Sequence, residues 1–191
     1  VKLDLVGPLE AKNTLSTRIK RRIYTSVLKK QYYHWTDPAV LRNYANQALQ
    51  KMSQFKSDAI LCPENSLPIS CLDSHLPIIL WSDATLYSLI NFYPYLSNLC
   101  RENFHNITAM EKAALDRCEM IIYTSDWAAQ TAIDAYGVEP SKVRVIPWGA
   151  NIECDRSLDD ISTIVEARNN KTCKLLFFAV EWLRKGGDVA L

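Results

Sequence analysis

Apolar residues along this chain follow two different spacings, which predict strands that alternate with helices. Short runs rich in β-branched and aromatic residues are typical of strands, and they cover 58–62, 77–81, 120–124 and 143–146. Around them, apolar residues recur every three or four positions, which predicts helices over 38–55, 86–90, 110–118 and 126–136. Alternation of this kind favours a parallel sheet. We therefore expect an α/β fold, a Rossmann-like parallel sheet flanked by helices.

Local signals mark the ends of several predicted helices. Ser125 is a good N-cap directly after the third strand, and Gly137 is a stop signal for the helix that Ser125 begins. Asp37 and Pro38 form an N-cap and first-turn pair. The run from Thr108 to Glu111 matches a capping box, which makes Glu111 a structural residue at the start of the 110–118 helix.

Both ends of the chain carry further predicted elements. A short strand is expected over 3–6, another over 174–180, and a connecting helix over 158–165. The chain begins without Met on the first of these strands and stops at Leu191, three residues into the helix expected after Gly187. A helix that short is not stable alone, so we expect the chain to be a fragment of a longer protein.

The stretch from residue 15 to residue 30 is basic and amphipathic. Leu15, Ile19, Ile23 and Val27 recur at a spacing of four, and Lys or Arg residues occupy the other faces. Such a helix can lie on a membrane surface or contact phosphates. A solvated helix is the simpler interpretation, and we favour it.

Composition limits the classes of protein to which this chain can belong. With 48% hydrophobic and 23% charged residues the chain can bury a core, and its net charge of +1 gives no general attraction to nucleic acid. The six cysteines show no C-x-x-C spacing, so we expect reduced thiols in a cytoplasmic, soluble protein, with no metal site. The chain has no P-loop, G-x-G-x-x-G, G-x-S-x-G or H-E-x-x-H pattern, which argues against nucleotidase, dehydrogenase, hydrolase and protease activities.

Polar residues follow two of the predicted strands at their carboxyl ends. Glu64, Asn65 and Ser66 come after the 58–62 strand, and Asp83 comes after the 77–81 strand. Ligands of open α/β sheets bind at this edge. A carboxylate there can accept a hydrogen bond from a ligand hydroxyl or take its proton. Asp83 could equally cap the helix that follows.

Two segments resemble a known enzyme family. The first runs from Ser125-x-Trp-Ala-Ala through Tyr136-Gly-Val to Lys142-Val-x-Val-Ile-Pro-x-Gly149-Ala-Asn151, and the second is the strand and loop that end in Arg184-Lys185-Gly186. In this order they resemble GT-B retaining glycosyltransferases of the family 4 type. The resemblance implies that residues 1–152 form most of the N-terminal, acceptor-side domain. Residues 153–191 would then be a linker helix and the start of the nucleotide-sugar-binding domain.

The resemblance also implies roles for individual residues. Arg184, Lys185 and Gly186 would hold the donor diphosphate, and Asp83 stands where similar enzymes have a His that faces the acceptor and the transferred sugar. The acceptor side of the cleft would be formed by Glu64, Asn65, Ser66, His105, Ser125 and Gly149. The implied reaction is metal-independent sugar transfer with retention, from a nucleotide-sugar substrate to a sugar or lipid-linked acceptor, with no cofactor. The glycine-rich first loop and the E-x7-E segment of the family lie outside this sequence, so we expect the chain alone to be inactive.

Two other functional classes remain open. The chain could be a non-catalytic Rossmann-like module that binds a ligand or a partner. It could also bind nucleic acid or a membrane surface through the helix from Arg18 to Lys30, which is the weakest of the three readings.

Overall fold

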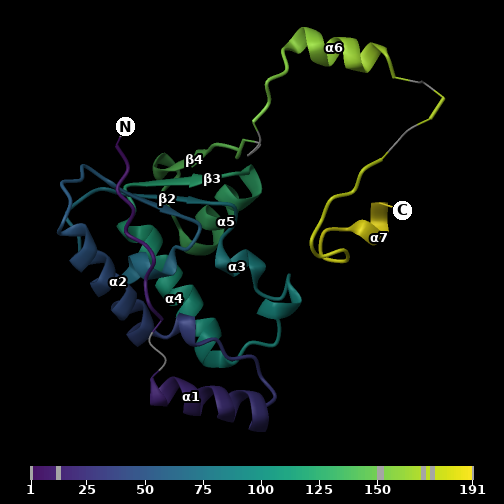
Figure 1. Ribbon diagram of the computed structural model, residues 1–191. Coiled ribbons are helices and arrows are strands. Elements are labelled where there is room, and N and C mark those ends of the chain that lie inside the picture. Colours follow the sequence, from purple (N-terminus) through teal and green to yellow (C-terminus); the bar gives the residue numbers. More distant parts are fainter. Residues whose placement is uncertain (1, 12–13, 150–152, 169–170, 173–174, 191) are drawn as a thin grey trace. The chain divides into compact units, whose positions relative to one another are not determined.

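The computed structural model describes residues 2–11, 14–149, 153–168, 171–172 and 175–190 (Figure 1). By its internal packing the chain divides into two units, Val1–Trp148 and Gly149–Leu191. The first unit contains a sheet and the helices that pack on it. The described part of the second contains α6 (Leu158–Glu166) and the four-residue α7 (Gly187–Ala190).

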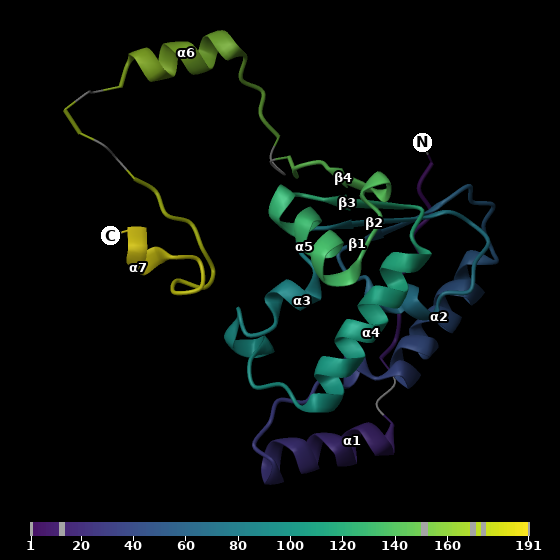
Figure 2. The ribbon, with the colours of Figure 1, turned by 180° about the vertical axis from the view of Figure 1, so that it is seen from behind.

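Four parallel strands form the sheet in the described part of the first unit (Figures 1 and 2). They are β1 (Ile60–Pro63), β2 (Ile78–Ser82), β3 (Met120–Tyr123) and β4 (Val143–Val145), and they lie in chain order. In the register, Leu80 of β2 stands opposite Cys62 of β1 and Ile121 of β3. The predicted fold class is confirmed: this is an α/β, Rossmann-like parallel sheet flanked by helices.

Helices cover one face of this sheet. The main ones are α2 (Pro38–Met52), α4 (Arg101–Arg117) and α5 (Asp126–Tyr136). Right-handed crossovers between strands in sequential order place every connection on the same side, which explains the single helical layer. Because side chains alternate along a strand, Leu80 and Ile121 are buried under the helices, whereas Leu61 and Met120 on the other face are 51% and 36% exposed.

Shorter elements complete the first unit. They are α1 (Leu15–Arg22), the π-helical turn Ile23–Val27, α3 (Leu86–Leu89), and 3₁₀ turns at His34–Thr36, Leu67–Cys71, Pro94–Leu96 and Pro140–Lys142. The helix predicted over residues 15–27 is therefore confirmed. None of the described helices has both the length and the apolar character needed to cross a membrane.

Both ends of α5 and the start of α2 lie where the local sequence predicts. The Ser125 hydroxyl accepts the amide of Ala128 at 3.3 Å and starts α5. Gly137 ends α5 in the left-handed conformation, with φ 67°, and donates its amide to the carbonyl of Ile133 at 2.9 Å. Asp37 accepts the amide of Ala39 at 2.9 Å and caps α2. Each of these helix ends is formed by residues a few positions apart in the sequence, so local sequence signals are enough to predict it.

The substitution Gly137→Ala should lower the free energy of unfolding by about 1 kcal/mol, because a Cβ is strained in the left-handed conformation. Space is not the reason, since a Cβ at this position would meet no atom within 4 Å. Urea unfolding followed by circular dichroism measures the change. Gly149→Ala is the control, because Gly149 has open surroundings and no positive φ. Equal stability of the two variants would contradict the prediction.

Two predicted strands are wrong. Residues 2–11 form no strand, and their backbone instead contacts α2: Gln47 accepts the amide of Glu10 at 2.8 Å, and Lys51 donates to the carbonyl of Pro8 at 2.5 Å. The described part of the second prediction, 175–180, is also not a strand. Neither segment pairs with a strand among the described residues. A strand needs a neighbour for its amides and carbonyls, so an apolar, β-branched sequence is not enough.

The predicted capping box is also wrong, because α4 begins at Arg101 rather than near Thr108. Thr108 lies inside the helix and donates to the carbonyls of Phe104 and His105 at 3.0 and 3.1 Å. The first turns of α4 are polar, which hides their helical spacing. They are fixed by Asn103, which is fully buried and whose amide oxygen accepts the backbone N–H of Tyr33 at 2.7 Å.

Candidate functional site

A pocket of about 280 Å³ lies beyond the carboxyl ends of β1 and β2. We call it the β1–β2 pocket, and its lining residues are Trp35, Glu64, Asn65, Ser82, Asp83, Ala84, Leu86, Leu89 and Glu111. Three of the residues predicted from sequence, Glu64, Asn65 and Asp83, therefore line one pocket. They meet because adjacent parallel strands end at the same edge of the sheet.

The loop after β1 is held firmly against β2. The amide of Glu64 donates to the carbonyl of Trp81 at 2.7 Å, and the Ser82 hydroxyl donates to the carbonyl of Glu64 at 3.3 Å. Glu64 has a φ of 67°, a conformation that non-glycine residues rarely adopt and that occurs often at functional sites. These bonds fix the loop while the side chains of Glu64 and Asn65 stay exposed to the pocket.

Asp83 is exposed at the pocket rather than used as a helix cap. The cap of α3 is Thr85, whose hydroxyl accepts the amide of Ser88 at 3.2 Å. The alternative that Asp83 caps this helix is therefore wrong. Its carboxylate stands where it can accept a hydrogen bond from a ligand or take a proton from a hydroxyl.

Glu111 reaches the pocket from α4 and is 2% exposed. Its carboxylate accepts the amides of Leu86 and Tyr87 at 2.7 and 3.1 Å and the hydroxyl of Tyr136 at 2.6 Å. Burial raises the pKa of Glu111, although these donors oppose the shift by favouring its charged form. Glu111 thus holds the start of α3 in place and joins α3, α4 and α5.

The charged side chains that line the β1–β2 pocket are acidic. Among the described residues that line it there are three carboxylates, those of Glu64, Asp83 and Glu111, and neither Lys nor Arg. The first amides of α3 already donate to Glu111, so they are not available to an anion. Trp35 adds an aromatic surface. This combination suits a ligand with hydroxyl groups, which donate to carboxylates and pack on an aromatic ring, and disfavours a phosphate.

Three other predicted residues of the first unit do not line this pocket. Ser66 is buried and its hydroxyl faces Glu111 at 3.5 Å. Ser125 is occupied in capping α5. His105 is exposed on α4 and lines a different, open groove of about 520 Å³ with Lys112, Asp116 and parts of α5. These three side chains therefore do not meet Asp83 in the β1–β2 pocket, because helix direction and capping turn them elsewhere, and their place on the acceptor side of a cleft stays a prediction.

The remaining predicted residues, Gly149, Arg184, Lys185 and Gly186, belong to the second unit. Arg184 forms an ion pair with Glu181, and Lys185 is exposed on the turn before α7. Gly186 has a φ of 76°, and Trp182 packs so closely on Gly187 that a Cβ there would lie 2.3 Å from the indole ring. The turn is thus fixed by its own residues, with its two cations at the surface.

The described residues form no metal cluster, and burial makes two of their cysteines, Cys62 and Cys118, unreactive. Within the described ranges there is no group of three or more His, Cys, Asp or Glu residues that could hold a metal ion. The described cysteines are all free thiols, and burial raises the pKa of Cys62 to about 11 and that of Cys118 to about 12. Both therefore remain protonated and unreactive near neutral pH. Cys173 lies outside the described residues.

Sequence reasoning missed the aromatic residue and the buried carboxylate of the β1–β2 pocket, Trp35 and Glu111. Trp35 belongs to an aromatic cluster from Tyr32 to Trp35 that carries no positional signal of its own. Glu111 has the residue type and spacing of a capping box, but its true partners, Leu86 and Tyr87, lie 25 and 24 residues away along the chain. The available signal was a carboxylate four residues from both Ile107 and Leu115, on the apolar side of the helix.

Comparison with known proteins gives no family assignment. No protein-family model matches the chain, and no curated protein matches it significantly.

Proposed function

We propose that the chain is part of a glycosyltransferase that moves a sugar from a nucleotide-sugar donor to a hydroxyl acceptor, with retention and without a metal. The observation that carries the proposal is the meeting of Glu64, Asn65 and Asp83 in one acidic pocket at the carboxyl edge of a parallel sheet. The resemblance of the Ser125–Asn151 and Leu175–Asp188 segments to family 4 enzymes supports the same function.

In this proposal the β1–β2 pocket takes the acceptor. A sugar acceptor offers hydroxyls to the carboxylates and an apolar ring face to Trp35. The Asp83 carboxylate accepts the hydrogen of the attacking hydroxyl and so raises its nucleophilicity. The fixed Glu64 loop and the Glu111-bound α3 keep the pocket in one shape, which limits the entropy lost when the acceptor is oriented.

The donor diphosphate needs positive charge, which the acidic pocket lacks. Arg184 and Lys185 supply it in the second unit, and they would stabilise the charge that develops on the leaving diphosphate. The proposal thus assigns the donor to residues of the second unit and the acceptor to the β1–β2 pocket of the first.

The test uses the native-length gene product and a panel of nucleoside diphosphate sugars. Released nucleoside diphosphate is followed in a coupled assay, with oligosaccharides and polyprenyl-linked sugars as acceptors and with and without EDTA. We expect one donor to yield a product with the donor's anomeric configuration, at a rate that EDTA leaves unchanged. Sugar binding without diphosphate release from any donor would contradict the proposal and favour the non-catalytic binding module.

The substitutions Arg184→Ala and Lys185→Ala should each weaken donor binding by about 10- to 150-fold, the equivalent of about 1.5–3 kcal/mol per charged contact. The weaker binding should appear as a higher KM for the nucleotide sugar. The KM for the acceptor should stay the same. Arg168→Ala removes a cation from the same unit and is the matched control. An unchanged donor KM in both variants would remove these residues from the donor site.

A further inference from the structure

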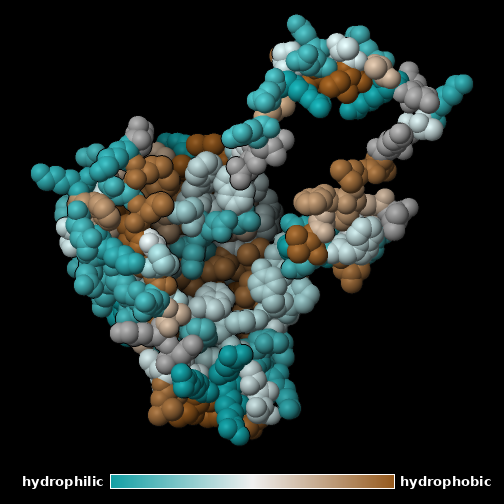
Figure 3. All heavy atoms as spheres, in the orientation of Figure 1, coloured by the Kyte–Doolittle hydropathy of each residue, from teal (hydrophilic) through white to brown (hydrophobic). Residues whose placement is uncertain are grey.

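The helix α1 turns its apolar side to solvent. Leu15, Ile19, Ile23 and Val27 are 74, 51, 47 and 71% exposed, although their spacing of four places them on one face. Leu28 follows with 53% of its surface exposed. In the space-filling view apolar atoms gather on the outer surface at the foot of the first unit, where α1 lies (Figure 3). An amphipathic helix of a folded domain normally buries this side.

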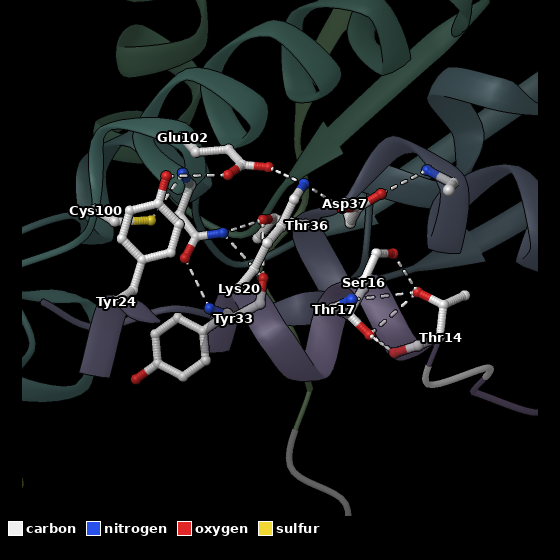
Figure 4. Close-up of polar contacts among 12 residues, drawn as sticks. Thr14, Ser16, Thr17, Lys20, Tyr24, Tyr33, Thr36, Asp37, Cys100 and Glu102 are labelled. Carbon is white, nitrogen blue, oxygen red and sulfur yellow. Dashed lines mark hydrogen bonds and ion pairs between the residues drawn. The ribbon is translucent and has the colours of Figure 1, made fainter. Parts of the chain in front are cut away.

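The side of α1 that faces the protein is polar instead. Lys20 pairs with both Asp37 and Glu102, and the Tyr24 hydroxyl donates to Glu102 at 3.1 Å (Figure 4). Thr17, on the same side, is 3% exposed. The hydrogen bond to Glu102 and the charge of Asp37 raise the pKa of Lys20, which keeps this lysine charged and the contact intact at neutral pH. The helix is therefore held by hydrogen bonds in an orientation that presents its apolar row outward.

Positive charge surrounds the exposed row. Arg18, Arg21 and Arg22 lie on α1 beside it, and Lys29 and Lys30 follow the π-helical turn. No acidic residue occurs between Thr14 and Gln31 in the sequence. Of the ion pairs that the described residues form, none involves these three arginines.

We propose that α1 and the following π-helical turn dock the protein on the surface of an anionic lipid bilayer. The apolar row would enter the boundary between headgroups and acyl chains, and the arginines and lysines would contact the anionic headgroups. Nucleic acid would engage the cations but leave five apolar side chains in water, so the exposed row favours lipid. This surface lies on α1 and does not depend on the transferase proposal.

Flotation of the full chain with phospholipid vesicles tests the docking. We expect binding to phosphatidylcholine vesicles that contain about 30% phosphatidylserine and at least about tenfold weaker binding to phosphatidylcholine alone. The double variant Ile19→Ser and Ile23→Ser should bind the anionic vesicles at least about tenfold more weakly. The triple variant Arg18→Glu, Arg21→Glu and Arg22→Glu should bind about a hundredfold more weakly or not at all. Every one of these side chains is exposed, and Lys20 and Tyr24 are left in place, so circular dichroism should show unchanged folding.

The helix α6 supplies the matched control. It also exposes apolar side chains, but acidic residues begin it, so the double variant Ile161→Ser and Ile164→Ser should bind vesicles as the unchanged chain does. Absence of vesicle binding by the unchanged chain would overturn the proposal, as would an equal loss in the α6 variant. A dimer that Ile19→Ser and Ile23→Ser dissociate would assign the apolar row to a second copy instead. Binding that a DNA oligonucleotide displaces and that the serine variant retains would assign the cations to nucleic acid.

Discussion

Replacing Glu111 by alanine should lower the free energy of unfolding by about 3–5 kcal/mol. The change leaves the amides of Leu86 and Tyr87 and the buried hydroxyl of Tyr136 without their acceptor. It also removes a side chain of α4 that bonds both α3 and α5. Urea or guanidinium unfolding, followed by circular dichroism, measures the difference.

Asp116→Ala is the matched control for Glu111→Ala. Asp116 also belongs to α4, but it is exposed and pairs only with Lys112 one turn earlier, so its loss should change stability by less than about 0.5 kcal/mol. Tyr136→Phe removes one of the donors to Glu111 and should cost about 1 kcal/mol, which lies between the effects of the other two substitutions. If Glu111→Ala were as stable as Asp116→Ala, the carboxylate would not hold α3, and the shape of the β1–β2 pocket would need another explanation.

The substitution Asp83→Asn should lower product formation by about 10²- to 10⁴-fold, the range usual for a group that receives a proton in the transition state. Asparagine has nearly the same shape but cannot accept that proton. Donor KM should stay unchanged, because the groups proposed to bind the donor, Arg184 and Lys185, belong to the second unit. Stability should also be unchanged, since the Asp83 side chain is exposed. The measurement is initial-rate kinetics of the native-length gene product with the donor and acceptor that the panel identifies.

Asp73→Asn provides the comparison for Asp83→Asn. Asp73 is also exposed, but it lies before β2, at the opposite end of that strand from Asp83, and lines a different pocket. Its substitution should leave the rate within about twofold of the unchanged protein, as surface changes away from a site usually do. Full activity in Asp83→Asn would exclude Asp83 as the proton acceptor, and Glu64 would be the next carboxylate of the pocket to test.

Glu111→Ala and Asp83→Asn distinguish two roles within one pocket: a residue that stabilises the fold and a residue that takes part in the reaction. Glu111 is buried and fully used by donors of the protein itself, so its loss should appear in stability. Asp83 has no such role and is exposed at the pocket, so its loss should appear in turnover. A transferase with an acceptor site here predicts both results, whereas a binding module predicts the first alone.

The sequence by itself determined the parts of this protein that depend on neighbours along the chain. Ser125 begins α5 and Gly137 ends it, and Asp37 and Pro38 begin α2. Sequence predicts these ends because caps and turns use residues only a few positions away. The strands β1 to β4 were predicted from their apolar runs. The grouping of Glu64 with Asp83 also followed from sequence, because adjacent parallel strands end at a common edge.

Tertiary structure decided what depends on distant partners. Residues 3–6 and 175–180 have strand composition but pair with no strand among the described residues, so hydrogen bonding rather than propensity decided their conformation. Glu111 holds the start of α3 only because α4, which carries Glu111, packs against α3 in the fold. The apolar spacing of α1 predicted the helix but not which side faces inward. Two ion pairs of Lys20 decided that, because their partners, Asp37 and Glu102, become neighbours only when the chain is folded.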